Sequence, residues 1–375
     1  MFPEQPPVRS EPADNPREEA LRLVEEAQRR LPRSIGNVLD GTAFLDGHPI
    51  SEREYHRAVR AAIRDYSRAI ELDPQCLEAY LRRALLYKRI AGERWLDRLT
   101  VNLLFRRRAE DFPEHQLAVA DARKVLALEP ADCGVYLTIS QLLSGEERVD
   151  ALRKGLSRAG GSRAYRGLLQ GELPLALMFD GQVRSAIREW RILLRESFSG
   201  VFHAEQLALC YSALEMHPET EAAFRLALGI FRHSGESNWL LLLPTPEEVA
   251  SNLAEGILRC RLRRGDWDGL RARLQLCAQY LLPGRDSGYR ALLSARSGER
   301  VDDLPGVLRH LRLRAKADPH PRFLAGLLLE SLGRHRESRR HYRSYLRELT
   351  RHEEERWYPW ERTHATRRLV EPEPG

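Results

Sequence analysis

The chain lacks the features of a membrane-spanning or secreted protein. Its longest apolar run, Trp239 to Leu243, ends at Pro244, whereas a helix that spans a bilayer needs about 20 apolar residues. The N-terminal residues MFPEQPP contain neither the basic nor the apolar region of a signal peptide. We therefore expect a soluble protein without a membrane span.

Cysteine is scarce and irregularly spaced. The five cysteines are Cys76, Cys133, Cys210, Cys260 and Cys277. They form no CxxC pair and have no zinc-ligand spacing, and several lie among apolar residues. A free thiol in such a place packs as a small hydrophobic side chain. The cysteines therefore predict reduced core thiols and a cytoplasmic location.

The sequence patterns of common catalytic sites are also missing. There is no GxxxxGK[ST] or GxGxxG phosphate loop, no HExxH zinc motif and no GxSxG nucleophile motif. His335 and His341 are six residues apart, a spacing that does not place them on one face of a helix. We expect a protein that is not an enzyme and that uses no cofactor and no metal ion.

Lysine is nearly absent, although the chain is rich in positive charge. Only Lys88, Lys124, Lys154 and Lys316 are lysines among the 60 basic residues, and the rest are arginines. This bias indicates either an arginine-rich codon usage or selection for contacts with nucleic acid or phosphate. The net charge of +6 does not decide between the two, because acidic residues are interleaved along the whole chain.

What the chain does contain is an internal repeat of large or apolar residues, which we call the large column. Its members are Tyr66, Ala122, Leu156, Trp190, Phe224, Leu274, Leu308 and Tyr342. They lie 34 residues apart, except for an extra 22 residues before Ala122 and an extra 16 before Leu274. A small column runs four residues earlier, from Ala62 to Ser338, and a late column three residues later, from Ala69 to Tyr345. These spacings place all three columns on one helix face, and the period is typical of stacked helical hairpins.

The composition of the chain predicts its organisation. We expect residues 1–14, which are rich in proline, to be disordered. Residues 15–350 are expected to form the solenoid, with insertions at about 92–114 and 235–249. Residues 351–375 are expected to form a C-terminal cap and tail, because an array must cover its last apolar face.

Helix starts and turns have local signals. Asn15 and Ser51 are predicted helix caps, and the helical pattern restarts at Thr245. Gly265 and Gly333 lie in short turns and are predicted to have positive φ.

The segment at the start of the array is predicted as a helix followed by a loop. The helix extends to about residue 31 and carries Leu21, Val24 and Leu31 on one side. The loop is rich in glycine and ends at Ser51.

The residues of the first repeat carry a family resemblance. The run Ala62, Tyr66, Ala69 and Pro74, followed by Tyr80, Ala84 and Tyr87, resembles the tetratricopeptide repeat signature. The resemblance covers about residues 51–350 and implies an all-α, right-handed superhelical solenoid of about eight antiparallel helix hairpins. Glu215 and Glu299 depart from the signature, because they stand where a turn glycine is expected, and Thr220 and Ser338 depart from it because they replace the small alanine. We expect their hairpins to be looser.

The resemblance also implies a concave groove, lined by the first helix of each hairpin, that binds a peptide or a partner helix. The predicted partner-binding residues are Arg259, Arg263, Tyr289, Arg290, Arg296 and Phe323. Such a basic strip with aromatic residues suits an acidic peptide segment, and a solvated arginine-rich face is the alternative interpretation. Asp266 and Asp268 in the adjoining turn are expected to neutralise part of the strip. Replacing Arg263 and Arg290 by Glu is expected to abolish binding without disturbing the fold.

Two other segments are candidates for binding. The insertion at about 92–114 has an apolar stripe that includes Trp95, followed by basic residues. It is either a docking element or an extension of the preceding helix that packs on the array. The cluster from Trp357 to Trp360 is interpreted as the cap of the array.

Together these patterns favour a non-catalytic scaffold or adaptor that binds another protein. The alternative is an α-solenoid that binds RNA or another nucleic acid through its arginine-rich surface. A salt titration of nucleic-acid binding separates the two, because contacts with phosphate weaken steeply as salt rises.

Overall fold

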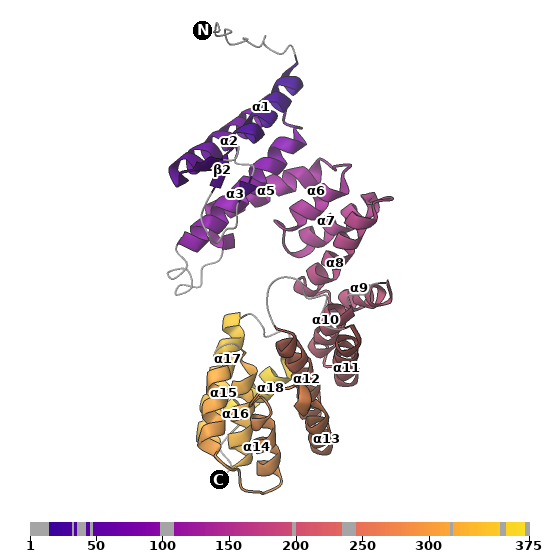
Figure 1. The fold of residues 1–375 in the computed structure, drawn as a ribbon, viewed down its shortest axis with the longest axis vertical. Coiled ribbons are helices and arrows are strands. Elements are labelled where there is room, and N and C mark those ends of the chain that lie inside the picture. The colour runs from indigo at the N-terminus through magenta and orange to yellow at the C-terminus, as the bar shows by residue number, and fades with distance from the viewer. Residues whose placement is uncertain are drawn as a thin grey trace. The chain divides into compact units, whose positions relative to one another are not determined.

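The computed structural model describes residues 15–31, 34–35, 43–45, 48–97, 109–196, 200–234, 245–315, 318–352 and 358–371. The chain forms two units, Met1–Asp180 and Gly181–Gly375, and each consists mainly of α-helices (Figure 1). The predicted disordered tail lies outside the described residues. That one continuous superhelix extends over residues 15–350 stays a prediction.

In unit 1, helices that follow each other along the chain pack together as hairpins: α1 on α2, α3 on α5, and α6 on α7. The helices are α1 (Pro16–Arg30), α2 (Glu52–Leu72), α3 (Leu77–Asp97), the 3-10 helix η1 (Ala109–Asp111), α5 (Pro113–Ala127), α6 (Cys133–Ser140), α7 (Gly145–Arg158) and α8 (Arg163–Phe179). Helices α2 and α3 also pack together, as do α7 and α8, so neighbouring hairpins cover each other's apolar faces.

A small antiparallel sheet occupies part of the region predicted as a loop. Its strands β1 (Ser34–Ile35), β2 (Ala43–Leu45) and β3 (His48–Ile50) pair in sequence order. Pro49 lies in the edge strand β3, where a residue without an amide hydrogen is tolerated. The loop prediction was wrong here, because strands of two or three residues are too short to show an alternating pattern.

Unit 2 repeats the hairpin pattern. Its helices are α9 (Val183–Glu196), α10 (Gly200–Ala213), α11 (His217–Ser234), α12 (Pro246–Arg263), α13 (Trp267–Cys277), the 3-10 helix η3 (Ala278–Tyr280), α14 (Ser287–Arg296), α15 (Leu304–Arg314), α16 (His320–Ser331), α17 (His335–His352) and α18 (Pro359–Val370). Helix α10 packs on α11, α12 on α13, α14 on α15, and α16 on α17. The last helix, α18, packs on α17. No helix within the described residues has both the length and the apolar character needed to cross a membrane.

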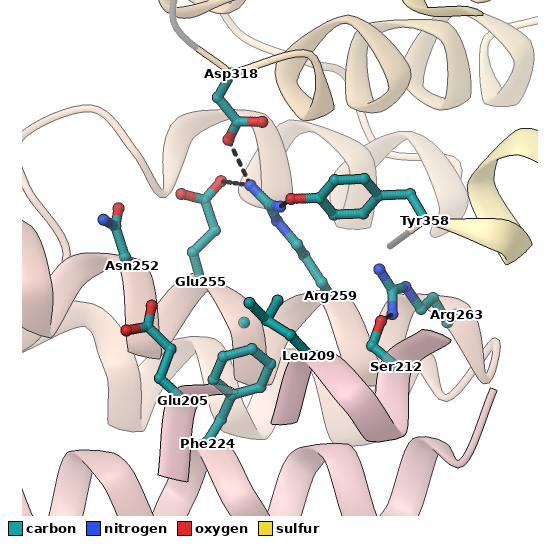
Figure 2. A pocket seen from close by; sticks show the side chains of 11 residues that line it. Glu205, Leu209, Ser212, Phe224, Asn252, Glu255, Arg259, Arg263, Asp318 and Tyr358 are labelled. Carbon is teal, nitrogen blue, oxygen red and sulfur yellow. Dashed lines mark hydrogen bonds and ion pairs between the residues drawn. The ribbon is translucent and has the colours of Figure 1, made fainter. Parts of the chain in front are cut away.

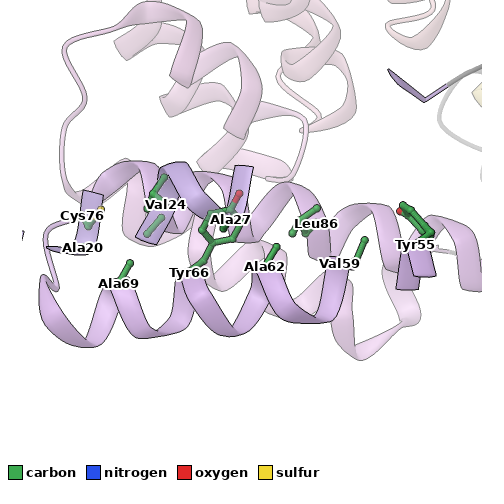
Figure 3. Close-up of a cluster of buried hydrophobic side chains, with 11 residues drawn as sticks. Ala20, Val24, Ala27, Tyr55, Val59, Ala62, Tyr66, Ala69, Cys76 and Leu86 are labelled. Atoms are coloured by element: carbon green, nitrogen blue, oxygen red, sulfur yellow. The ribbon is translucent and has the colours of Figure 1, made fainter. Parts of the chain in front are cut away.

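Most members of the repeat columns are buried in the cores of the two units, as predicted, whereas Leu156 and Leu308 of the large column and Leu304 of the small column are partly exposed. Tyr66, Trp190 and Tyr342 of the large column have no exposed surface. Figure 3 shows Tyr66 of α2 beside Ala27 of α1, with Ala62 one turn away on α2. The small alanines allow the helices to approach closely, and the tyrosine ring fills the space between them. Burying one such ring contributes about 1.5–3 kcal/mol.

Two polar members of the small column are also buried. The Thr220 hydroxyl donates to the Met216 carbonyl and the Ser338 hydroxyl to the Gly326 carbonyl, each at 2.8 Å. Because each hydroxyl has a backbone partner, the helices remain closely packed where alanine is replaced.

The turns confirm one prediction and correct another. Gly265 and Gly333 have φ of 64° and 72°, as predicted. Glu215 adopts the same left-handed conformation at φ 57°, although a side chain makes it unfavourable. Near Glu299 the left-handed residue is Gly298, at φ 72°, so this turn does contain a glycine, one residue before the expected position.

Several local predictions are tested by the helix ends. The side chains of Asn15, Ser51 and Thr245 each cap a helix, the last two in complete capping boxes. Of the three residues predicted on one side of α1, Val24 is buried and Leu31 packs partly buried against the core, whereas Leu21 is 46% exposed and lies outside the buried face. That face carries Ala20, Val24 and Ala27, which are small enough to pack closely.

The candidate insertion at about 92–114 is only partly described. Helix α3 runs to Asp97, so the first part of the insertion extends the preceding helix, which was one of the two interpretations. Residues 98–108 and the Trp95 side chain lie outside the described part, as do residues 235–244 of the second insertion.

Candidate partner-binding site

The arginines of α12 lie in the interior of unit 2. Twelve of the 18 residues of this helix are buried, so its charged side chains need partners inside the protein. Arg261 lies 2.7 Å from Glu221 and 2.5 Å from Asp266. Arg259 and Arg263 belong to two further clusters, which surround the candidate site.

Glu255 is the centre of the first cluster and is 2% exposed. Nη2 of Arg314 donates to both of its carboxylate oxygens, at 3.0 and 2.9 Å. Arg285 donates to it at 3.4 Å, and Arg259 lies 3.8 Å away. Arg259 also donates to Asp318 at 2.5 Å. Burial raises the pKa of Asp318, but the charge of Arg259 and the hydrogen bonds from the His320 amide and Arg259 together outweigh this effect, so the pKa is lowered and the ion pair persists.

Arg263 and Glu361 form the second cluster, with side chains 4% and 1% exposed. Nε and Nη2 of Arg263 each lie 2.8 Å from Oε1 of Glu361, and Nη1 donates to the Ser212 hydroxyl. Burial lowers the pKa of Arg263, but the contributions that raise it, the charge of Glu361 first among them and the hydrogen bond to Glu361, together outweigh burial, so the pKa is raised and the guanidinium stays charged.

Helix α18 brings Glu361 to α12. Trp360 packs edge-on against Phe323 of α16, with ring centroids 5.7 Å apart. Farther along α18, Arg368 lies 2.7 Å from Glu330 of α16. Helix α18 is therefore held against α12 and α16, the first helices of two hairpins. One buried ion pair joins it to α12, and an aromatic contact and a second ion pair join it to α16.

Beside this helix is a pocket of about 310 Å³, which Figure 2 shows from close by. It is lined by Glu205, Leu209, Ser212, Phe224, Asn252, Glu255, Gly256, Arg259, Arg263, Asp318 and Tyr358. Most of these come from the first helices α10 and α12, at spacings of three and four residues that place them on one face of each helix. The pocket thus lies on the helices that the tetratricopeptide resemblance assigns to binding.

The charged side chains that line this pocket differ in whether they have a partner. Arg259 and Arg263 are paired with carboxylates, and both guanidiniums lie beside the Tyr358 ring, 5.8 and 5.9 Å from its centre. Glu205 is half-buried and has no hydrogen bond or ion pair within the described residues. Burial raises the pKa of Glu205, and no cation of the described residues lowers it.

A second pocket, of about 400 Å³, lies where α12, α14, α16 and α18 meet. Arg296 stacks on Trp267 there, 4.6 Å from the ring centre, and forms no ion pair within the described residues. Arg264 and Trp360 also line this pocket, so it combines aromatic walls with positive charge.

The six predicted residues do not form one open strip. Arg259 and Arg263 line the first pocket, and Arg296 lines the second. Arg290 is exposed and pairs with Asp286 at 2.5 Å, and it lines neither pocket.

The predicted exposure of the two aromatic residues was wrong. Tyr289 and Phe323 have no exposed surface. The Tyr289 hydroxyl is hydrogen-bonded to Nε2 of His320 at 3.1 Å, and Phe323 is covered in part by Trp360 of α18. A face expected to be open to a partner is thus covered by the chain itself.

The proposed reversal of Arg263 was based on the same error. Arg263 is buried, so glutamate there would face Glu361 in the interior and disturb the fold. Asp266, which was expected to neutralise part of the predicted strip, pairs with Arg261 instead.

Three residues of the site were missed: Glu205, Asp318 and Glu361. Glu361 had a weak signal, since it adjoins the cluster from Trp357 to Trp360, which was interpreted as a cap and contains Tyr358 of the site. Glu205 and Asp318 lie among charged or apolar residues that appear ordinary in the sequence. Within the described residues, no group of three or more His, Cys, Asp or Glu side chains is placed to hold a metal ion.

Comparisons with known proteins give distant likenesses. No family model and no curated protein matches the chain. Yeast Tom70 is similar at 12% identity and a TM-score of 0.38, over 99% of this chain and 67% of that one. A signal-transduction ATPase with a tetratricopeptide repeat sensor, from Pyrococcus horikoshii, is similar at 14% identity and a TM-score of 0.41, over 96% of this chain and 55% of that one.

A human IFIT1 dimer with PPP-AAAA is similar at 16% identity and a TM-score of 0.29, over 79% of this chain and 69% of that one. The tetratricopeptide-like character of this chain rests on its own helices and on the burial of its repeat columns.

Proposed function

We propose that this chain is a non-catalytic protein-interaction scaffold of the tetratricopeptide repeat type. Unit 2 binds a segment of a partner protein along the pocket-bearing face of α10 and α12. The proposal is carried by the contacts that hold α18. This helix binds α12 through the buried ion pair of Arg263 and Glu361, and α16 through the aromatic contact of Phe323 and Trp360. A surface that holds a helix of its own chain in this way has the chemistry to hold a polypeptide.

The pocket beside α18 is where a partner segment is expected to bind. Leu209 and Phe224 supply apolar surface, and Asn252 supplies a polar group near Glu205 (Figure 2). A mixture of apolar surface with a few placed polar groups is typical of a specific binding site. The acidic partner predicted from the sequence now depends on Arg290 and Arg296, because Arg259 and Arg263 are neutralised within the protein.

A display library of random peptides, selected on the full chain, tests this function. Peptides are expected to be enriched, and Leu209→Ser is expected to weaken their binding about tenfold or more, because it removes apolar surface from the pocket. The matched control is Leu226→Ser on α11, which alters a 48% exposed leucine that does not line the pocket. Melting temperatures establish that both variants fold. No enriched peptide, or equal binding by both variants, would contradict the proposal.

Nucleic-acid binding is the second candidate, and the second pocket favours it. Trp267 and Trp360 offer surfaces for stacking, and Arg264 and Arg296 offer positive charge. Electrophoretic binding to single-stranded RNA at increasing salt tests it. Steeply salt-dependent binding that is weakened by Arg296→Gln would support this candidate over the scaffold.

The location of the protein is part of the same proposal. All five cysteines are free and buried, which supports a reducing compartment such as the cytoplasm.

A further inference from the structure

We propose that the pocket of Figure 2 binds a basic side chain, arginine or lysine, of the partner segment, and that Glu205 is its counter-ion. This inference rests on the proposed function and names the chemistry of the partner. It reverses the charge expected from the sequence, because the arginines of the pocket are already neutralised while one carboxylate is not.

Most of the charged side chains that line the pocket are paired within the protein. Arg259 is paired with Asp318, and Arg263 with Glu361. Glu255 receives two hydrogen bonds from Arg314. Among the charged side chains that line the pocket, this leaves Glu205 without an ion pair within the described residues. Glu255 has Arg314, Arg285 and Arg259 within 3.8 Å, so Glu205 is the lining carboxylate that still lacks a cation among the described residues and can pair with one from a partner.

The pocket combines polar groups with apolar surface. Figure 2 shows Glu205 and Asn252 on one side, with Arg263 and Tyr358 on the other. Leu209 and Phe224 also line it. Arginine and lysine carry an apolar stem below a charged head, so the stem can lie on the apolar wall while the head reaches the carboxylate. The volume of about 310 Å³ has room for one such side chain.

The Glu205 carboxyl is partly desolvated in the protein alone. Burial raises the pKa of this carboxyl, which means that part of its hydration is lost without a compensating contact. A bound guanidinium or ammonium group would supply that contact through charge-assisted hydrogen bonds. An acidic side chain in the same place would instead be repelled by Glu205 and would find Arg259 and Arg263 already engaged.

Three peptides test the choice of charge on the full chain at physiological salt. They are acetyl-Ala-Ala-Arg-Ala-Ala-amide, the same peptide with lysine, and the same peptide with citrulline, a neutral analogue of arginine. Their affinities are measured by NMR titration. The arginine or the lysine peptide is expected to bind about tenfold or more tightly than the citrulline peptide. Equal binding of all three, or no binding of any, would overturn the inference.

Variants of the protein then locate the counter-ion. Glu205→Gln is expected to remove the preference for the charged peptides, whereas Glu219→Gln, an exposed glutamate on α11 that does not line the pocket, is expected to keep it. A preference that survives in Glu205→Gln would overturn the assignment.

The pH dependence provides an independent readout. Binding of a cation favours ionised Glu205, so affinity is expected to rise as the pH increases through the raised pKa of this group. The charged and titratable groups that face it across the pocket are Glu255, Arg259, Arg263, Asp318 and Tyr358. Because they are retained in Glu205→Gln, a rise that persists in that variant would show that another group is responsible and overturn the assignment.

The stability of Glu205→Gln shows whether the variant folds. The pKa of Glu205 is higher in the folded protein than in the unfolded chain, so the folded state binds more protons, and ionisation disfavours folding as the pH rises. At neutral pH the variant is therefore expected to melt at the same temperature as the wild type or higher. A clearly lower melting temperature would mean that Glu205 has a structural partner and would overturn its role as a free counter-ion.

The peptide library separates the two proposals. Enriched peptides that carry a basic residue and lose affinity with Glu205→Gln would support both. Enriched peptides without a basic residue would overturn the inference and leave the scaffold function in place. A library without any enriched peptide would overturn the scaffold function itself.

Discussion

The two units of this chain are built on the same hairpin repeat but place their charges differently. In unit 1, pairs such as Arg29–Glu25 and Arg123–Glu147 have both side chains more than 40% exposed. In unit 2, the carboxylates of Glu221, Glu255 and Glu361 are at most 5% exposed, and each is paired with arginine. The repeat therefore fixes the positions of the apolar residues. It does not fix whether a charged residue lies on the surface or in the interior.

The physical reason for the difference is the burial of α12. A helix with one apolar stripe sends its arginines to the solvent, whereas α12 is enclosed on most sides and its arginines must be paired. Unit 1 has a smaller version of this arrangement, in which Arg83 holds Asp121 through two hydrogen bonds of 2.8 Å. Buried charges of this kind give unit 2 a polar interior beside its candidate site.

The largest expected effect comes from breaking one buried pair. Glu361→Ala leaves Arg263 charged and buried, so it is expected to lower the free energy of unfolding by about 3–5 kcal/mol. The matched change in unit 1, Glu147→Ala, removes the partner of an exposed arginine and is expected to leave the free energy of unfolding nearly unchanged, because solvent screens that pair. Urea denaturation measures both, and similar losses would remove the distinction between the units.

A double variant sharpens the same point. Replacing Arg263 by Met together with Glu361 by Leu removes both buried charges and keeps apolar volume. We expect it to recover most of the stability lost in Glu361→Ala, again measured by urea denaturation. A double variant as unstable as the single one would show that packing, and not charge, decides the effect.

An intermediate effect is expected at two tyrosines of the large column. In unit 2 the Tyr342 hydroxyl donates to Glu330 at 2.7 Å, so Tyr342→Phe is expected to cost about 1.5–3 kcal/mol. In unit 1 the buried Tyr66 hydroxyl has no hydrogen-bond partner among the described residues, and burial raises the pKa of Tyr66 to about 12. Tyr66→Phe is therefore expected to leave the melting temperature unchanged or to raise it. A loss of stability at residue 66 as large as that at residue 342 would contradict this assignment.

The smallest effects concern the turns, where we expect the two units to behave alike. Glu129 in unit 1 and Glu215 in unit 2 have φ of 48° and 57°. Replacing either by glycine relieves about 1–2 kcal/mol of strain but adds flexibility to the unfolded chain, so the free energy of unfolding is expected to rise by up to about 1 kcal/mol.

Gly265→Val is expected to lower the free energy of unfolding by about 1–2 kcal/mol, because valine would have to adopt φ near 64°. Thermal melting of the three variants checks this, and opposite signs at residues 129 and 215 would show that the turns differ as well.

The apolar core could be predicted from the sequence because its signal is local and periodic. Tyr66, Trp190 and Tyr342 recur in one phase, and the 3.6-residue turn of a helix converts that phase into a buried face. The left-handed turns at Gly265 and Gly333 were predictable for a similar reason, because glycine adopts that backbone conformation without strain.

The candidate site was only partly predictable, because its partners are far apart in sequence. Arg263 and Glu361 are separated by 98 residues, and many other carboxylates were available in a chain with 54 of them. Nothing in the spacing of the charges selects one pair over another. For the same reason, Phe323 was expected on an open face, since only the folded chain brings Trp360 onto it.

The sequence by itself therefore determined that this protein consists of helix hairpins, with apolar faces, caps and turns set by residues close together in the chain. The tertiary structure decided which arginines are neutralised, which aromatic residues are covered by α18, and that Glu205 lacks a partner among the described residues. The physical reason is the separation along the chain over which each effect acts. Helix geometry acts over a few residues and leaves a period in the sequence, whereas a buried ion pair depends only on where two distant side chains meet.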